Sequence, residues 1–194
     1  MDNTEDQALI DRFKNGDNSA FGEIVLKYQN KTYNLCRHML ASRQDAEDAA
    51  QEVFLKAYQA LPRFQPEAAL YTWLYRIAVN TCLDYKRIPI LESLFGTSQE
   101  GEFLIHDRAS DDPSPEALYQ SKEIDIGLRK SLGKLSPKLR AIIILKEMED
   151  LSYEEIAETI GISMGTVKSR IARAREELKK LMKDFREQND NNSV

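Results

Sequence analysis

The sequence has 194 residues, 42% of them hydrophobic, and a formal net charge of −5. This length suits one sizeable hydrophobic core or two small ones, while no apolar run reaches the roughly 20 residues of a membrane span and the polar N-terminus lacks a signal-peptide pattern. Because two cysteines are too few for a secreted disulfide framework, we expect reduced thiols and a cytoplasmic protein.

The first part of the chain, 1–87, has the composition and spacing of helices. It is rich in Ala, Leu, Glu, Lys and Gln, with apolar residues at steps of three and four. Gly16 and Pro62 interrupt this pattern. The spacing predicts helices over 6–14, 19–39, 43–61 and 70–87.

The helix expected over 43–61 has two distinct faces. One is apolar and should face a core; it holds Ala46, Ala49, Val53, Ala57 and Leu61. The other is acidic and partly apolar; it holds Asp48, Gln51, Glu52 and Leu55. This second stripe suits a basic protein partner, although such patterns are more often solvated helix faces.

The helix expected over 70–87 interleaves aromatic and basic residues with an apolar stripe. Trp73, Tyr75 and Arg76 are adjacent or nearly so, and such a mixture could stack bases and contact phosphates. The competing interpretation is that the aromatic side chains pack into a core, Trp73 above all.

The middle of the chain has the composition of a linker. Residues 87–121 hold two basic against seven acidic side chains, a balance of −5, together with three prolines and two glycines. We therefore predict an all-α protein made of two small helical domains, 1–87 and 122–194, joined by a flexible acidic linker over 88–121.

The last part of the chain predicts helices over 115–134, 137–148, 152–160 and 163–186. Within it, 151–170 reads as a helix-turn-helix. Ser152 and Glu155 form a capping box, Gly161 supplies the turn, and Ser163 caps the second helix. An inward face follows; it holds Val167, Ile171, Ala174 and Leu178.

The two helices of this motif differ in net charge. Residues 141–162 hold one basic and six acidic side chains, a balance of −5, whereas 163–183 hold seven basic and two acidic ones, a balance of +5. The second helix is therefore the one that approaches nucleic acid, where Lys168, Arg170 and Arg173 can meet phosphates or base edges. A solvated basic face is the competing interpretation.

Three runs in this order, 45–58, 72–80 and the helix-turn-helix with 165–170, closely resemble the extracytoplasmic-function sigma factors of bacteria. The resemblance covers nearly the whole chain apart from the linker. It implies a subunit that recruits core RNA polymerase to promoters, with the first domain as the family's region 2 and the last as its region 4.

The resemblance also assigns roles to individual residues. The polymerase-binding positions would be Asp48, Gln51, Glu52 and Leu55. The contacts to the −10 element would come from the loop 63–69, which captures a flipped base, and from the helix after it; the residues are Arg63, Phe64, Tyr75, Arg76 and Asn80. The −35 readers would be Lys168, Ser169, Arg170, Ala172 and Arg173.

The partners implied are the β′ and β subunits of RNA polymerase, promoter DNA and an anti-sigma factor, in a stress response. We expect no cofactor, metal site, small-molecule substrate or catalytic residue, since no phosphate loop, nucleophile elbow or metal constellation occurs in the sequence. A helix-turn-helix regulator that acts alone is the alternative; it would not bind core polymerase.

Overall fold

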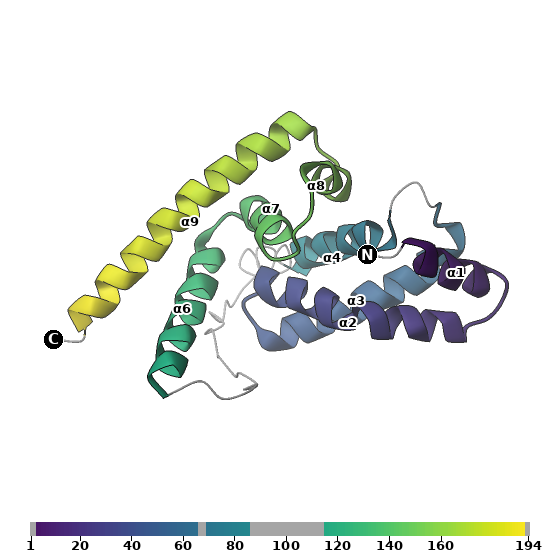
Figure 1. Ribbon diagram of the computed structural model, residues 1–194, viewed down its shortest axis with the longest axis horizontal. Helices are drawn as coiled ribbons and strands as arrows, with labels where there is room; N and C mark the ends of the chain where they lie inside the picture. The colour runs from purple at the N-terminus through teal and green to yellow at the C-terminus, as the bar shows by residue number, and fades with distance from the viewer. Residues whose placement is uncertain (1–2, 66–68, 86–114, 193–194) are drawn as a thin grey trace, which may run out of the picture.

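The computed structural model describes residues 3–65, 69–85 and 115–192, and in these residues every regular element is helical (Figure 1). The elements are α1 (Asn3–Lys14), α2 (Ser19–Met39), α3 (Arg43–Ala60), the short 3₁₀ turn η1 (Leu61–Arg63), α4 (Leu70–Tyr85), α6 (Pro115–Lys134), α7 (Pro137–Glu147), α8 (Tyr153–Ile160) and α9 (Met164–Asn192). The all-α prediction is confirmed.

Local signals in the sequence set several of the helix ends. The Ser42 and Ser136 hydroxyls accept hydrogen bonds from the backbone N–H groups of Asp45 and Leu139, and so cap α3 and α7. Helix α9 runs past the expected 186 to Asn192, since no proline or glycine interrupts it. Residues 88–114 of the predicted linker lie outside the described residues, and 115–121 belong to α6.

Helices α1 to α4 form the first half of the molecule around a core of their own. Helix α3 contributes the small side chain of Ala57. The larger side chains come from α1, α2, η1 and α4; they include Ile10, Phe13, Ile24, Tyr28, Leu61, Leu70, Trp73 and Leu74. Buried Asp6 ties α1 to α2, because its carboxylate accepts a 2.6 Å hydrogen bond from the Tyr28 hydroxyl and lies 2.8 Å from Lys27 Nζ.

Helices α6 to α9 form the second half, in which long α9 packs along both α6 and α7. Figure 1 shows α9 running from the turn after α8 to the C-terminus. Phe185 near its end lies directly against Gly127 of α6, where a Cβ atom would stand 2.6 Å from the ring. The part of α9 beyond the helix-turn-helix therefore packs against α6 and holds it in place.

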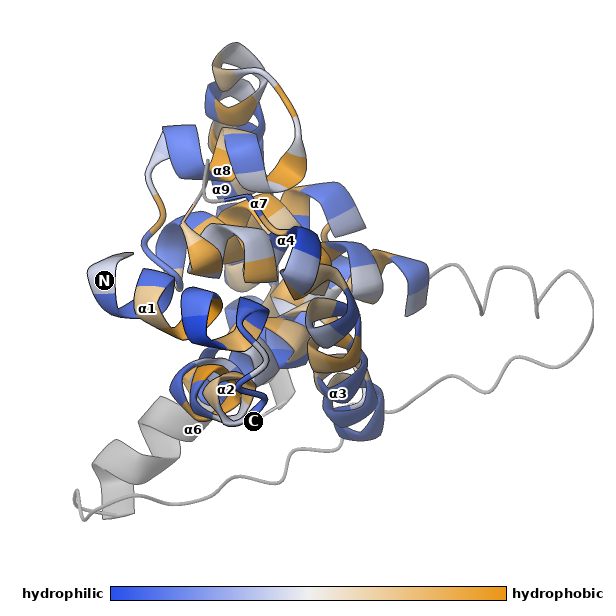
Figure 2. Ribbon diagram, turned by 90° about the vertical axis from the view of Figure 1, so that its right-hand side faces the viewer, coloured by the Kyte–Doolittle hydropathy of each residue, from blue (hydrophilic) through white to orange (hydrophobic). Residues whose placement is uncertain are grey.

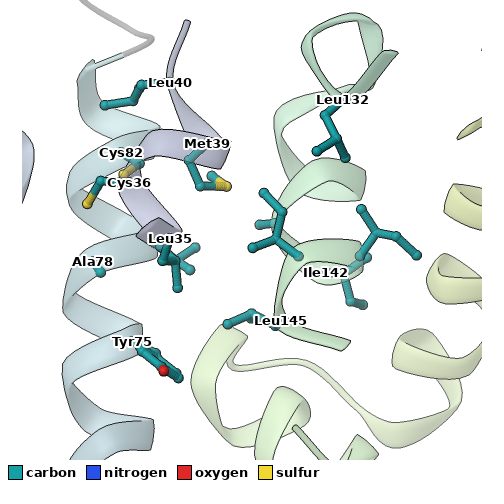
Figure 3. Close-up of a cluster of buried hydrophobic side chains, with 14 of the residues drawn as sticks. Leu35, Cys36, Met39, Leu40, Tyr75, Ala78, Cys82, Leu132, Ile142 and Leu145 are labelled. Atoms are coloured by element: carbon teal, nitrogen blue, oxygen red, sulfur yellow. The ribbon is translucent and has the colours of Figure 1, made fainter. Parts of the chain in front are cut away.

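The two halves share a second hydrophobic core. Its buried residues come from α2, α3 and α4 on one side and from α6 to α9 on the other; they include Leu35, Met39, Ala78, Cys82, Leu132, Ile142, Leu145 and Val167. Figure 3 shows Leu35 and Met39 facing Ile142 and Leu145 across the boundary. Helix α7 packs on α2 in this core and α8 packs on α4; Figure 2 shows hydrophobic colour in the interior of the molecule and the outer turns of α3 coloured hydrophilic.

Arg140 of α7 links the two halves through backbone carbonyls. Its guanidinium is buried and donates to the carbonyls of Leu132 at 2.5 Å, of Leu135 at 3.2 Å and of Gly133 near the end of α6. It also donates a 2.8 Å bond to the Met39 carbonyl at the end of α2. Burial lowers the pKa of Arg140 to about 10, so the group remains charged at neutral pH.

Replacing Arg140 by Met should destabilise the chain. Arg140→Met keeps an unbranched apolar stem but leaves the terminal carbonyls of α6 and the Met39 carbonyl buried without a donor. Unsatisfied buried groups of this kind cost about 1 to 3 kcal/mol, so the urea midpoint followed by circular dichroism should fall. Lys138→Met, on an exposed position of the same helix, is the control, and equal midpoints for the two variants would contradict this role.

Candidate functional site

The acidic stripe predicted on α3 lies on the outer surface. Asp48, Gln51 and Leu55 are exposed, Glu52 is half-buried, and Leu55 keeps 65% of its surface in water. The opposite face of the helix is buried as expected; it holds Ala46, Ala49, Val53 and Ala57. Glu52 forms a 2.7 Å ion pair with Lys56 one turn later. A strongly exposed leucine beside carboxylates is a surface that a protein partner could cover.

A groove of about 570 Å³ lies between this stripe and α2. Val25 and Tyr33 of α2 and Phe54 of α3 line it, with Gln51 and Leu55 at its edge. Leu26, on the next position of α2, is 70% exposed. Sequence analysis missed the α2 side of this surface, because only the packing of α2 on α3 brings the two helices together.

The aromatic-basic helix, α4, divides the residues predicted for it between surface and interior. Arg63, Arg76 and Asn80 are exposed. Phe64 is buried with its ring centroid 4.9 Å from that of Trp73, and Tyr75 is wholly buried. The interpretation of Trp73 as a core residue therefore agrees with the structure. Phe64 is buried beside it, and Tyr75 is buried in the second core, which the two halves share.

A polar cleft of about 380 Å³ opens at the start of α4. Arg63, Phe64 and Gln65 line it from the loop before the helix, and Trp73 and Arg76 line it from the helix. Residues 66–68 of the same loop lie outside the described residues. Glu158 of α8 also lines the cleft, so two guanidinium groups and two aromatic rings share it with a carboxylate from the other half of the chain.

Two tyrosines of α4 donate hydrogen bonds to carboxylates of the second half. The Tyr75 hydroxyl donates a 2.5 Å bond to Glu149, which lies between α7 and α8, and the Tyr71 hydroxyl donates to Glu155 of α8. Burial raises the pKa of Tyr75, and the bond to Glu149 raises it further, so the hydroxyl stays protonated. A cleft of about 520 Å³ beside these bonds is lined by Lys31, Tyr71 and Glu155 among others.

The helix-turn-helix has the local geometry that the sequence predicts. The backbone N–H of Ser152 donates to Glu155 at 2.7 Å, and the backbone N–H of Glu155 donates to the Ser152 hydroxyl at 3.2 Å. Gly161 has the left-handed φ of 71° that ends α8. The Ser163 hydroxyl accepts from the Thr166 N–H at 3.3 Å. These three positions fix the angle between α8 and α9.

Helix α9 turns its apolar residues inward and its basic residues outward. Val167, Ile171 and Ala174 are buried, whereas the predicted DNA readers are exposed or, for Arg170, half-buried; these are Lys168, Ser169, Arg170, Ala172 and Arg173. Arg173 Nε lies 2.8 Å from Glu177 one turn later. Arg175 is paired with Glu147 of α7 at 2.6 Å, which fixes that arginine on the protein rather than on an outside partner.

Other site classes find little support in the described parts of the chain. Among these residues no group of three or more His, Cys, Asp or Glu could hold a metal ion. Cys36 and Cys82 are buried in the shared core, and neither forms a disulfide. No described helix has the length and apolar character to cross a bilayer.

Two family models match the chain, one in each half. The model Sigma-70 region 2 matches residues 24–87 and the model Sigma-70, region 4 matches residues 127–178. The first match covers α3 and α4 with their predicted stripe and cleft, and the second covers the helix-turn-helix. An isolated helix-turn-helix regulator would not account for the match in the first half.

Curated relatives match along most of their length. The RNA polymerase sigma-H factor of Pseudomonas aeruginosa is 41% identical over 184 residues, which are 92% of this chain and 94% of the relative. The ECF RNA polymerase sigma-E factor of Escherichia coli is 40% identical over 176 residues, 88% of this chain and 91% of the relative. The ECF factor SigW of Bacillus subtilis is 39% identical, with 91% and 96% covered.

Solved structures show the same arrangement of helices. CnrH, solved in complex with the cytosolic domain of CnrY, superposes with a TM-score of 0.68 at 25% identity and covers 93% of this chain and 99% of its own. The sigma factor RpoE of Bartonella quintana, solved with the anti-sigma factor NepR, has a TM-score of 0.67 at 27% identity, with 84% and 96% covered.

Loss of the Ser152 cap should weaken the helix-turn-helix measurably. Ser152→Ala removes the acceptor for the Glu155 N–H and should cost about 1 kcal/mol of unfolding free energy. Ser152→Asp is the matched variant, because aspartate caps as well as serine and should retain most of the stability. Chemical denaturation followed by circular dichroism measures both, and equal losses in the two variants would show that the cap does not stabilise α8.

Proposed function

Because the chain belongs to the extracytoplasmic-function group of sigma factors, which direct promoter-specific transcription with core RNA polymerase, we propose that three of its surfaces divide this work. The α3 stripe binds polymerase; it consists of Asp48, Gln51, Glu52 and Leu55. The −10 face binds the promoter strand; it consists of Arg63, Phe64, Tyr75, Arg76 and Asn80. The outward face of α9 reads the −35 element; it consists of Lys168, Ser169, Arg170, Ala172 and Arg173.

The observation that carries the first assignment is the exposure of Leu55 between acidic neighbours on a rigid helix. Three carboxylate or amide side chains around one exposed apolar side chain form a small hydrophobic centre with a polar rim. The partner that fits has basic residues around an apolar patch, as we propose for the β′ subunit. The groove beside α2 enlarges the area that such a partner covers.

Reversing charge on the α3 stripe should weaken polymerase binding without unfolding the chain. Gln51→Ala with Glu52→Lys removes a polar contact and places a cation against a basic partner, so the loss should exceed that of truncation alone. Neither side chain belongs to the buried face of α3, so helical content should remain. A direct titration of core polymerase measures the affinity.

The matched control for this double change is Gln188→Ala with Glu187→Lys. It makes the same two substitutions on adjacent exposed residues near the end of α9, outside the proposed stripe. Equal polymerase affinities for the two double variants would remove the assignment of α3.

The −10 face is supported by residue chemistry and by the cleft beside it. Arg63 and Arg76 are exposed cations next to Phe64 and Trp73, and single-stranded nucleic acid is commonly held by cations along its backbone and aromatic rings against its bases. In the present conformation Phe64 and Tyr75 are buried. A contact of Tyr75 with DNA therefore requires the second half to move away from α4, and a contact of Phe64 requires its ring to leave the core of the first half.

The α9 face is supported by exposure and by its position in the motif. Lys168 and Ser169 stand near the start of the second helix and Arg173 follows about one turn later. Side chains near the start of a recognition helix reach base edges in the major groove. The partner of Arg173 in the structure, Glu177, is half-buried one turn later, and a guanine edge would replace it in a complex.

Separate proposals concern protein partners and location. The Bartonella relative is solved with an anti-sigma factor, and we propose that a protein of this class also restrains the present chain. We further propose that the chain works in the cytoplasm, where polymerase and DNA are, and that it has no catalytic activity of its own.

A pair of alanine variants should separate base reading from phosphate binding. If Arg173 makes a bidentate base contact, Arg173→Ala should cost about 1 to 3 kcal/mol and relax the preference at one −35 position. Lys179→Ala, an exposed lysine on the same helix, should weaken binding to all sequences and lower the salt dependence by about one unit of slope. The measurement is binding of the full chain to single-base −35 variants at several salt concentrations; a uniform loss for Arg173→Ala would place it among the phosphate contacts.

A further inference from the structure

The acidic side of the helix-turn-helix packs on the aromatic-basic helix of the other half. Helix α8 lies against α4. Three carboxylates lie on this side, which we call the acidic corner: Glu149 and Glu155, which are hydrogen-bonded to α4, and Glu158, which lines the cleft beside it. They belong to the stretch 141–162, which has six acidic side chains against one basic. The charge imbalance of this stretch therefore has a partner within the chain.

Two carboxylates of the acidic corner accept hydrogen bonds from α4, and the third lines a cleft that holds two arginines. The Tyr75 hydroxyl donates to Glu149 and the Tyr71 hydroxyl donates to Glu155. Glu158 shares the cleft with the guanidinium groups of Arg63 and Arg76. Carboxylate oxygens and phosphate oxygens are both anionic acceptors, and hydroxyl and guanidinium groups bind either of them.

Closure also hides one ring on which a base could stack. Tyr75 is wholly buried in the core that the two halves share, whereas Phe64 and Trp73, at 5% and 8% of their full exposure, are buried in the core of the first half and line the cleft that Glu158 enters. Tyr75 lies under the connection between α7 and α8 through its bond to Glu149. A DNA strand could not reach Tyr75 while the corner occupies its present place.

We propose that the acidic corner is an intramolecular competitor for single-stranded DNA at the −10 face, so that the free chain holds that face closed. This inference rests on the proposed function of the −10 face. It gives the acidic half of the helix-turn-helix a role separate from that of the basic half, which reads duplex DNA.

The competition is confined to one of the three proposed surfaces. Asp48, Gln51 and Leu55 of the α3 stripe are exposed in the closed chain, and so are Lys168 and Arg173 of α9. Polymerase can therefore meet α3 before the two halves separate. On the −10 face Arg63, Arg76 and Asn80 are exposed as well, but the strand gains access to Tyr75 and displaces the corner's carboxylates only when the corner leaves α4.

The test removes two carboxylates of the corner from the full chain. Glu149→Ala with Glu158→Ala deletes the acceptor for Tyr75 and the anion beside the two arginines, and leaves the capping residue Glu155 in place. The control is Glu154→Ala with Glu176→Ala, two exposed glutamates that line neither cleft. Both variants lose the same charge, so a general change in attraction for DNA cancels between them.

Three measurements read the result. A labelled single-stranded DNA of mixed sequence at low salt reports the affinity by anisotropy, and small-angle scattering reports the radius of gyration. Trp73 is the only tryptophan in the sequence and lines the cleft with Glu158, so its fluorescence reports opening and base stacking directly.

We expect the corner variant to show a larger radius of gyration, red-shifted Trp73 emission and tighter DNA binding than the control, by about fivefold or more, which is the range of ordinary coupling between sites. Unchanged scattering and unchanged affinity would overturn the proposal, because the carboxylates would then not hold the two halves closed. Opening without a gain in affinity would overturn it as well.

Adding Arg76→Ala to the corner variant separates this proposal from the assignment of the −10 face. If DNA binding falls when Arg76 is removed, the −10 face binds DNA, and any failure to gain affinity on opening belongs to the competition alone. If Arg76→Ala changes nothing in the open variant, the assignment of the −10 face is wrong and the competition falls with it.

Discussion

Helix α4 must bury two faces at once, and the arrangement of the whole chain depends on this. It packs on α2 and α3 along one side and on α8 along another, and nine of its sixteen residues are buried. Leu70 and Leu74 belong to the core of the first half, whereas Tyr75, Ala78 and Cys82 belong to the core shared with the second. The helix proposed to bind the promoter strand is thus also the one that joins the two halves.

The junction between the two halves is held by hydrogen bonds as well as by apolar contacts. The hydrogen bonds limit the free energy that favours the closed arrangement. The apolar contacts around Met39 and Ile142 gain from leaving water, but Tyr71, Tyr75 and Glu149 could all find water partners when the halves separate. Exchange of protein partners for water makes the net contribution of each hydrogen bond small, about 1 kcal/mol. Arg140 differs, because it also satisfies the end of α6 within the second half.

The sequence predicted where the helices lie better than which helices pack on one another. Ser42, Ser136 and Gly161 act on the backbone within a few residues, so the helix ends near them follow from local chemistry. The exposure of the α3 stripe followed from periodicity. The burial of Phe64 and Tyr75 did not, because an aromatic side chain near basic ones fits a core and a nucleic-acid surface equally well. Only tertiary packing decides between them, within the first half for Phe64 and between the halves for Tyr75.

The packing of α8 on α4 explains why the helix-turn-helix has one acidic helix and one basic helix. Charges separated by more than about 10 Å are screened at moderate salt, so the acidic face of α8 acts on what it touches, which is α4, and the basic face of α9 acts on what approaches from outside. The left-handed turn at Gly161 lets the two faces point in different directions. A contact built from carboxylates against hydroxyl and guanidinium groups weakens with salt, as does the DNA contact that replaces it, so the exchange between them depends on geometry more than on ionic strength.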